Sequence, residues 1–87
     1  PADRVALGEI ARGEGRVISL NGHKVAAHRQ EDGGLSLCSA VCTHLKCIVA
    51  WNEAERTWDC PCHGSRFTPS GDVISGPAEA PLPKIVP

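Results

Sequence analysis

The chain has 87 residues, of which 41% are hydrophobic, and its nine Lys and Arg residues nearly balance ten Asp and Glu residues. This length suits one small domain. Its hydrophobic core would be small, and domains of this size are often stabilised by a disulfide or a bound metal. A net charge of -1 with no basic stripe excludes a nucleic-acid interface as the expected function. The longest apolar run, CIVAW, is far below the roughly 20 residues of a membrane span, so a soluble chain is expected.

Short segments rich in β-branched and apolar residues alternate with turn signals, which predicts an all-β domain. The predicted strands are 16–20, 24–28, 35–41, 57–60 and 84–86. The Asn21-Gly22 pair is a strong signal for a two-residue hairpin between the first two strands. In the third strand, Leu37 and Cys38 point to opposite faces, so we expect both faces to be covered.

The rest of the chain is predicted to be loop. The one helix candidate, NEAER at 52–56, is interpreted as a turn because no longer helical period surrounds it. From Gly76 onward the chain holds four prolines, so this segment can follow a sheet edge or cover a site but cannot form a central strand.

Metal-binding side chains gather in two stretches, CTHLKC (42–47) and CPCHGS (60–65). The spacing C-x-H-x2-C-x12-C-x-C-H places six ligand-type residues within 22 positions. A tetrahedral zinc or a binuclear iron-sulfur centre needs four ligands, so two of the six must serve another purpose.

Read with the GPA triplet at 76–78, the two stretches resemble the Rieske 2Fe-2S motif. The resemblance implies an antiparallel β-sandwich with a small cluster-binding subdomain made of two loops. It implies one Rieske domain over residues 1–87, with its cluster-binding part at about 41–68 and a covering loop at about 75–81. We also expect the chain to be a fragment of a longer protein.

The resemblance implies a role for each of the six side chains. One 2Fe-2S cluster would be bound by the thiolates of Cys42 and Cys60 on one iron, and by the imidazoles of His44 and His63 on the other. Cys47 and Cys62 would form a disulfide that ties the two loops together and stabilises the fold by about 3 kcal/mol.

Four neighbours are expected to touch or shield the cluster. The resemblance implies that the Ser65 hydroxyl donates to a bridging sulfide, and that Leu45 and Pro77 keep water away. Phe67 stands where high-potential members from cytochrome bc complexes have a tyrosine. Loss of that donor, at about 1.5 kcal/mol, predicts a potential lower by about 60 mV, which the nearby Lys46 cation would partly offset.

Other interpretations of these residues are weaker. The four predicted ligands could also hold one zinc, but zinc gives no reason for the CPCHGS stretch. A thiol-redox role for Cys60-x-Cys62 lacks the surrounding βαβ pattern. Elsewhere, Cys38 is predicted to be a buried small hydrophobe, His23 and His28 surface strand residues, and Trp51 and Trp58 core or rim residues.

The predicted function is one-electron transfer, with no catalytic residue in this domain. The stretch from Cys47 to Leu82 looks most like the C-terminal Rieske domain of bacterial FAD-dependent oxidoreductases of the amino-acid-oxidase type. A flavin domain or another redox protein would then dock at the exposed edges of His44 and His63. The cytoplasm is favoured as its location.

Three alternatives stay open. One is a free-standing Rieske ferredoxin that serves an oxygenase or a reductase. Another is a soluble fragment of a cytochrome bc complex Rieske subunit, against which the short x12 insertion and Phe67 argue. The third, from a different class, is an interaction module in which a zinc ion is only a structural staple.

Overall fold

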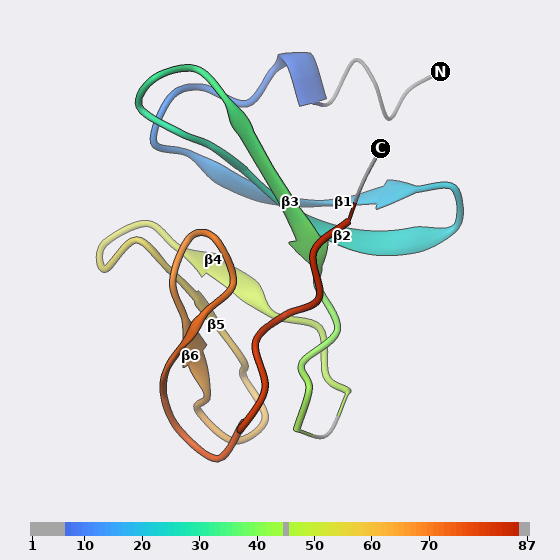
Figure 1. The fold of residues 1–87 in the computed structure, drawn as a ribbon, viewed down its shortest axis with the longest axis vertical. Coiled ribbons are helices and arrows are strands. Elements are labelled where there is room, and N and C mark those ends of the chain that lie inside the picture. The colour runs from blue at the N-terminus through green and yellow to red at the C-terminus, as the bar shows by residue number, and fades with distance from the viewer. Residues whose placement is uncertain (1–6, 45, 86–87) are drawn as a thin grey trace.

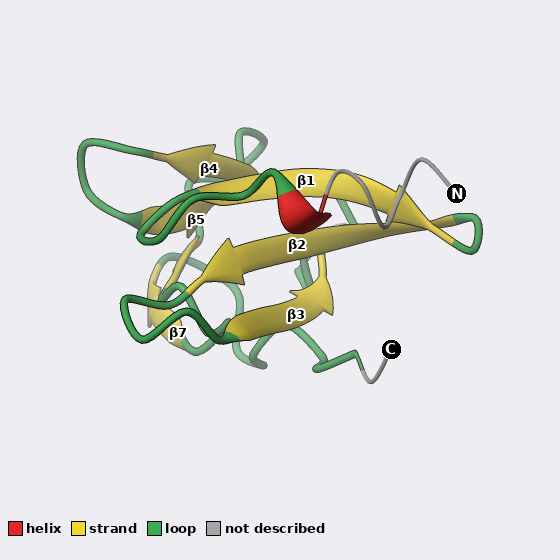
Figure 2. Cartoon of the chain, turned by 90° about the horizontal axis from the view of Figure 1, so that it is seen from above, coloured by secondary structure: helices red, strands yellow, loops and turns green. Residues whose placement is uncertain are grey.

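Two antiparallel sheets make up the protein in a computed structural model that describes residues 7–44 and 46–85. One sheet contains, in spatial order, β1 (Gly15–Leu20), β2 (His23–Arg29) and β3 (Leu35–Ser39). The other contains β4 (Ala50–Asn52), β5 (Thr57–Asp59), β6 (Arg66–Phe67) and β7 (Val73–Ser75) (Figure 1). A helical turn at residues 7–8 precedes β1 (Figure 2). The predicted all-β, antiparallel architecture is confirmed.

The hairpin between β1 and β2 turns at Asn21 and Gly22, as predicted. Leu20 pairs with His23 across a two-residue loop, and the loop residues have φ angles of 52° and 81°. Two successive positive φ angles define a type I′ turn, whose twist matches that of the flanking strands.

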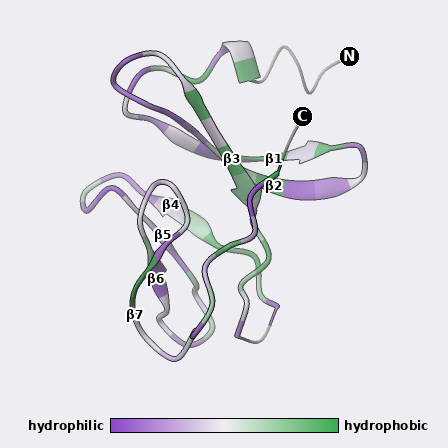
Figure 3. Cartoon of the chain, viewed as in Figure 1, coloured by the Kyte–Doolittle hydropathy of each residue, from purple (hydrophilic) through white to green (hydrophobic). Residues whose placement is uncertain are grey.

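Both faces of the three-stranded sheet are covered, so that side chains alternate between two cores. Leu37 packs on one face and Cys38 on the other, which confirms the prediction that both faces of β3 are covered. Figure 3 shows hydrophobic residues along this strand. The outer core contains Ile10, Ile18, Val25, Ala27 and Leu37. The inner core, shared with the second sheet, includes Ala26, Cys38, Cys42, Trp58, Phe67 and Leu82.

The second sheet is built from strands of only two or three residues. Trp58 of β5 is paired with Trp51 of β4 on one side and with Phe67 of β6 on the other. Residues 53–56 form the predicted turn, closed by the Arg56 N–H donating to the Asn52 carbonyl at 2.7 Å. β5 lies within the predicted strand 57–60, whereas β4, β6 and β7 were not predicted, since strands of two or three residues give only a weak period-two signal.

The proline-rich C-terminal segment follows the edge of β3, as predicted (Figure 1). The Ser39 N–H donates to the Pro83 carbonyl at 2.7 Å, and the Ile85 N–H donates to the Leu37 carbonyl at 2.9 Å. The strand predicted at 84–86 is wrong, since Lys84 makes a single bridge to Cys38 and Val86 lies outside the described residues. Proline, which has no N–H to donate, prevents a continuous ladder here.

His28 is buried, which corrects the prediction of a surface histidine. Only 8% of the residue is exposed, and its ring lies 5.2 Å from that of Trp51. His28 shares the face of β2 that carries Ala26, and this face packs against the second sheet. Trp51 in turn lies 4.9 Å from the buried Trp58, so both tryptophans are core or rim residues, as predicted.

Within the described part of the chain, no helix has the length and hydrophobicity needed to cross a bilayer.

Candidate metal centre

The first ligand loop (residues 42–47) is closed by its own backbone. The Cys42 N–H donates to the Cys47 carbonyl at 2.7 Å, and the Lys46 N–H donates to the Cys42 carbonyl at 2.9 Å. Lys46 has a φ angle of 60°, in the left-handed region that glycine adopts most easily. This tight turn places Cys42 inside the protein and His44 at its surface.

The second ligand loop (residues 60–65) joins β5 to β6 and has a similar closure. The Cys60 N–H donates to the Ser65 carbonyl at 2.8 Å, and the Gly64 N–H donates to the Cys60 carbonyl at 3.0 Å. Gly64 has a φ angle of 78°, which a residue with a side chain rarely adopts. The loop therefore begins and ends at two strands that are themselves paired.

The four predicted ligands divide into a buried pair and an exposed pair. Cys42 and Cys60 are 0% and 3% exposed and belong to the same buried core cluster. His44 and His63 are exposed, and their ring centroids lie 5.3 Å apart at an interplanar angle of 86°. The two loops thus place both thiols in the same buried cluster and bring the two imidazoles together at the surface.

Hydrogen bonding makes the Cys60 thiol more acidic. Burial raises its pKa, but the N–H groups of Cys62 and His63, together with the Cys42 thiol, lower it by more, so the net pKa falls below the ordinary value. The same donors stabilise a thiolate, the form in which cysteine binds a metal.

Cys47 and Cys62 form the predicted disulfide between the two loops, with an S–S distance of 2.04 Å and a sequence separation of 15. The sulfur atoms of these two residues and Cys60 all lie within 4.8 Å of one another. Two of those three sulfurs are bonded to each other, which leaves Cys60 as the member of the group that is free to bind a metal.

The covering loop (residues 75–81) is attached to both ligand loops. The Ala78 N–H donates to the Ser65 hydroxyl oxygen at 3.1 Å, and the Thr43 hydroxyl donates to the Ala80 carbonyl at 2.6 Å. At Gly76, which has a φ angle of 95°, a Cβ atom would overlap the backbone of Ser65. Thr43 was missed by the sequence reasoning, although its place between two predicted ligands was a signal.

The remaining predicted neighbours lie as follows. Ser65 and Phe67 are fully buried, whereas Pro77 is exposed. Pro77 lines a pocket of about 450 Å³ together with His44 and Glu79. Leu45 lies outside the described residues.

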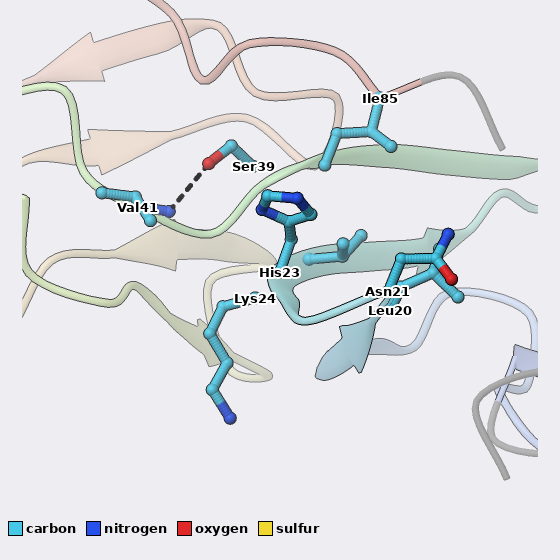
Figure 4. Close-up of a pocket in the computed structure, with 8 residues that line it drawn as sticks. Leu20, Asn21, His23, Lys24, Ser39, Val41 and Ile85 are labelled. Carbon is cyan, nitrogen blue, oxygen red and sulfur yellow. Dashed lines mark hydrogen bonds between the residues drawn. The ribbon is translucent and has the colours of Figure 1, made fainter.

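A second pocket, of about 470 Å³, lies at the hairpin end of the three-stranded sheet (Figure 4). Its lining includes His23, Lys24 and Val41, but none of the predicted site residues that the structure describes. The side chains with metal chemistry therefore gather at the two ligand loops and not at the larger cavity.

The donor set fits a 2Fe-2S cluster of the Rieske type. Such a cluster takes two cysteines on one iron and two histidines on the other, and this structure offers two free thiols beside two neighbouring imidazoles. The hydroxyl of Ser65 accepts the Ala78 N–H, which leaves its own proton free to be donated.

Comparison with known proteins identifies the same family that the motif resembles, the Rieske 2Fe-2S family. The family model described as the Rieske [2Fe-2S] domain matches residues 4–86. The chain therefore belongs to the Rieske 2Fe-2S family. It carries one 2Fe-2S cluster of the Rieske type, and its function is electron transfer.

Three relatives illustrate the range of similar proteins. A Bacillus subtilis protein named as a Rieske 2Fe-2S iron-sulfur protein, YhfW, is 53% identical over 81 residues, which are 93% of this chain and 16% of that protein. The cytochrome b6-f complex iron-sulfur subunit of Chlorobaculum tepidum is 42% identical over 85% of this chain and 40% of the subunit. The crystal structure of the plasma membrane Rieske protein PetC3 from Synechocystis PCC 6803 superimposes with a TM-score of 0.75 at 31% identity, covering 98% of this chain and 81% of that one.

Proposed function

We propose that Cys42 and Cys60 bind one iron of the cluster and that His44 and His63 bind the other. The observation that carries this assignment is the combination of two buried thiols in one core cluster with two exposed imidazole rings whose centroids lie 5.3 Å apart. A cluster held in this way accepts and returns one electron at a time. The Ser65 hydroxyl donates to it, Leu45 and Pro77 limit the access of water, and Phe67 supplies no hydroxyl to a ligand sulfur.

His44 and His63 form the edge at which a redox partner docks. Both residues are exposed, whereas Cys42 and Cys60 are buried. An electron therefore has its shortest path to another protein through the imidazoles. The covering loop, attached through Thr43 and Ser65, holds this edge in place when a partner binds.

Spectroscopy of single variants tests the ligand assignment. His44→Ala and His63→Ala proteins are expected to lose the visible absorption and the low-average-g EPR signal of a histidine-ligated 2Fe-2S centre. His23→Ala is the matched control, because this exposed histidine lies on β2 and outside both ligand loops. A colourless wild-type protein with one bound zinc would overturn the assignment and favour the structural module.

The parent protein is proposed to be a flavin-dependent oxidoreductase in which this domain exchanges electrons with the flavin. The stretch from Cys47 to Leu82 resembles the Rieske domain of such enzymes. The relative YhfW supports the proposal that this domain belongs to a longer protein. The 81 matched residues are only 16% of YhfW, so YhfW is about six times as long as this chain. On this proposal residues 1–87 are one Rieske domain of a longer chain, with its cluster-binding part at about 41–68.

A place in a cytochrome bc or b6-f type complex is the second candidate. The cytochrome b6-f subunit of Chlorobaculum tepidum, 42% identical, favours it. The fully buried Phe67, which has no hydroxyl to donate, favours the flavin enzyme. A free-standing ferredoxin would instead be encoded by a gene of little more than this length.

Rapid mixing of the full-length parent with its reducing substrate separates these candidates. The flavin proposal expects the flavin to be reduced first and the cluster absorption to bleach afterwards. A parent with no bound flavin would contradict it. For the compartment we propose the cytoplasm, which fractionation of cells producing the full chain can test.

A further inference from the structure

Two opposite charges stand at the two ends of the second ligand loop. Asp59 directly precedes the loop and Arg66 directly follows it, and the two residues face each other in the β5–β6 register. The Arg66 Nε atom lies 3.4 Å from the Asp59 Oδ1 atom. The loop that carries Cys60 and His63 is thus closed at its base by an ion pair as well as by the strand pairing.

The Asp59 carboxylate is held on both of its oxygens. The Thr57 hydroxyl donates to Oδ1 at 2.6 Å, and the Asn52 amide donates to Oδ2 at 2.8 Å. These donors come from β5 and β4, while Arg66 belongs to β6. Because three strands fix this one carboxylate, its negative charge keeps a constant position relative to Cys60.

Stability alone gives a poor account of this arrangement. The side chains of Arg66 and Asp59 are 41% and 27% exposed, and ion pairs that are open to solvent contribute only about 0–1 kcal/mol. A carboxylate next in sequence to a cluster ligand also bears on electron transfer, because negative charge near the cluster disfavours the addition of an electron. The Arg66 guanidinium, 3.4 Å from the carboxylate, opposes this effect with a charge of the other sign.

We propose that Asp59 and Arg66 are positioning residues that form a charge-compensated pair, which holds the second ligand loop and keeps the carboxylate from lowering the reduction potential. This inference rests on the proposed ligand set. It predicts that removing one charge exposes the field of the other. The two single variants must then shift the potential in opposite directions.

Redox titration of four proteins tests the pair. Arg66→Gln is expected to shift the reduction equilibrium at least threefold toward the oxidised form, and Asp59→Asn at least threefold toward the reduced form. Threefold corresponds to about 28 mV for a one-electron couple. The double variant is expected to return close to the wild type, and Arg66→Lys, which keeps the charge, to stay close to it.

Two matched controls complete the experiment. The Arg56–Glu31 pair, with side chains 56% and 76% exposed, lies away from both ligand loops, so Arg56→Gln is expected to leave the potential unchanged. High salt is expected to reduce both opposite shifts, because it screens exposed charges. Iron content and EPR line shape verify that each variant holds its cluster.

If the reduction potential shifts in the same direction in both single variants, or shifts in neither, the proposal of a charge-compensated pair is wrong. If Asp59→Asn does not fold, Arg66→Gln and Arg66→Lys still test the proposal. Equal reduction potentials in these two variants would also contradict the charge-compensated pair. Failure of the proposed ligand set has a different signature. The wild type itself would then lack the histidine-ligated 2Fe-2S signal, whatever the variants do.

Discussion

The three-stranded sheet and the cluster region (β4 to β7 with the two ligand loops) are held together in different ways. The sheet has strands of six, seven and five residues joined by continuous ladders, whereas the cluster region has strands of three, three, two and three residues. In the cluster region the ladders are short, and a disulfide, loop closures and side-chain hydrogen bonds supplement them. The part of the molecule that carries the chemistry therefore depends on cross-links, and the other part on regular β-structure.

The two regions share one core, so that a change at their contact affects both. Ala26 and Cys38 from the first sheet pack in the same cluster as Trp58 and Phe67 from the second. On the same face, Gly15 of β1 lies against the indole ring of Trp51. The two regions can therefore be perturbed at a cross-link, at their contact, or at one side chain of either region.

Removal of the disulfide is expected to have the largest effect. The Cys47→Ala/Cys62→Ala variant should lose about 3 kcal/mol of unfolding free energy, because the bond closes a loop of about 15 residues. Urea unfolding followed by the visible absorption of the cluster measures the loss.

A reductant provides the control for this prediction. Dithiothreitol should bring the wild type down to the stability of the variant and leave the variant unchanged. A variant as stable as the oxidised wild type would show that the cluster and the loop closures suffice without the bond.

Gly15→Ala is expected to disturb the contact between the two regions. A Cβ atom at this position would overlap the ring of Trp51, and such overpacking costs about 1–3 kcal/mol. Thermal unfolding measures it, and Gly8→Ala is the control because a Cβ there meets no atom within 4 Å. Equal unfolding temperatures for the two variants would mean that Trp51 moves aside without loss.

Phe67→Tyr should change the cluster region alone. If the added hydroxyl donates a hydrogen bond of about 1.5 kcal/mol to the reduced centre, the potential rises by about 60 mV. Protein-film voltammetry measures the rise, with unfolding by urea as a check that the buried site accepts the extra oxygen. An unchanged potential in a stable, fully loaded protein would contradict the role given to Phe67.

The sequence predicted the two regions unequally, for a physical reason. The strands of the first sheet have a visible period and a strong turn at Asn21-Gly22, so their positions and the hairpin were predicted well. β6 and β7 have two and three residues, and their place depends on the loops that they connect. The Cys47–Cys62 bond was predicted from the family resemblance, and the structure confirms it.

Contacts between segments far apart in the chain were beyond sequence reasoning. The Thr43 hydroxyl reaches Ala80 and the Ala78 N–H reaches Ser65, and neither contact has a local pattern. Asp59 and Arg66 are seven residues apart in the sequence, and only the β5–β6 register shows that they face each other. His28 was misplaced because an isolated histidine in a strand does not show that a second sheet covers its face.

The smallest predicted effect is the pH dependence of the unfolding free energy that His28 causes. His28 lies at the contact between the two regions. Burial lowers its pKa from the ordinary value of 6.5, the Glu31 carboxylate acts in the opposite direction, Arg56 lowers it and Glu53 raises it. His28 Nδ1 and Trp51 Nε1 also have no hydrogen-bond partner among the described residues. The buried ring is therefore more stable in its neutral form.

The sign of the pH dependence follows from this lowered pKa. The unfolded chain binds the proton more readily than the folded one, so the stabilising contribution is complete above pH 6.5 and is lost as the pH falls through the folded pKa. His28→Phe keeps a ring against Trp51 and removes the titration, so its unfolding free energy should fall less on acidification than that of the wild type. His23→Phe, at an exposed position, should keep the wild-type slope. Parallel slopes for all three proteins would contradict the lowered pKa of His28 as a source of the acid sensitivity.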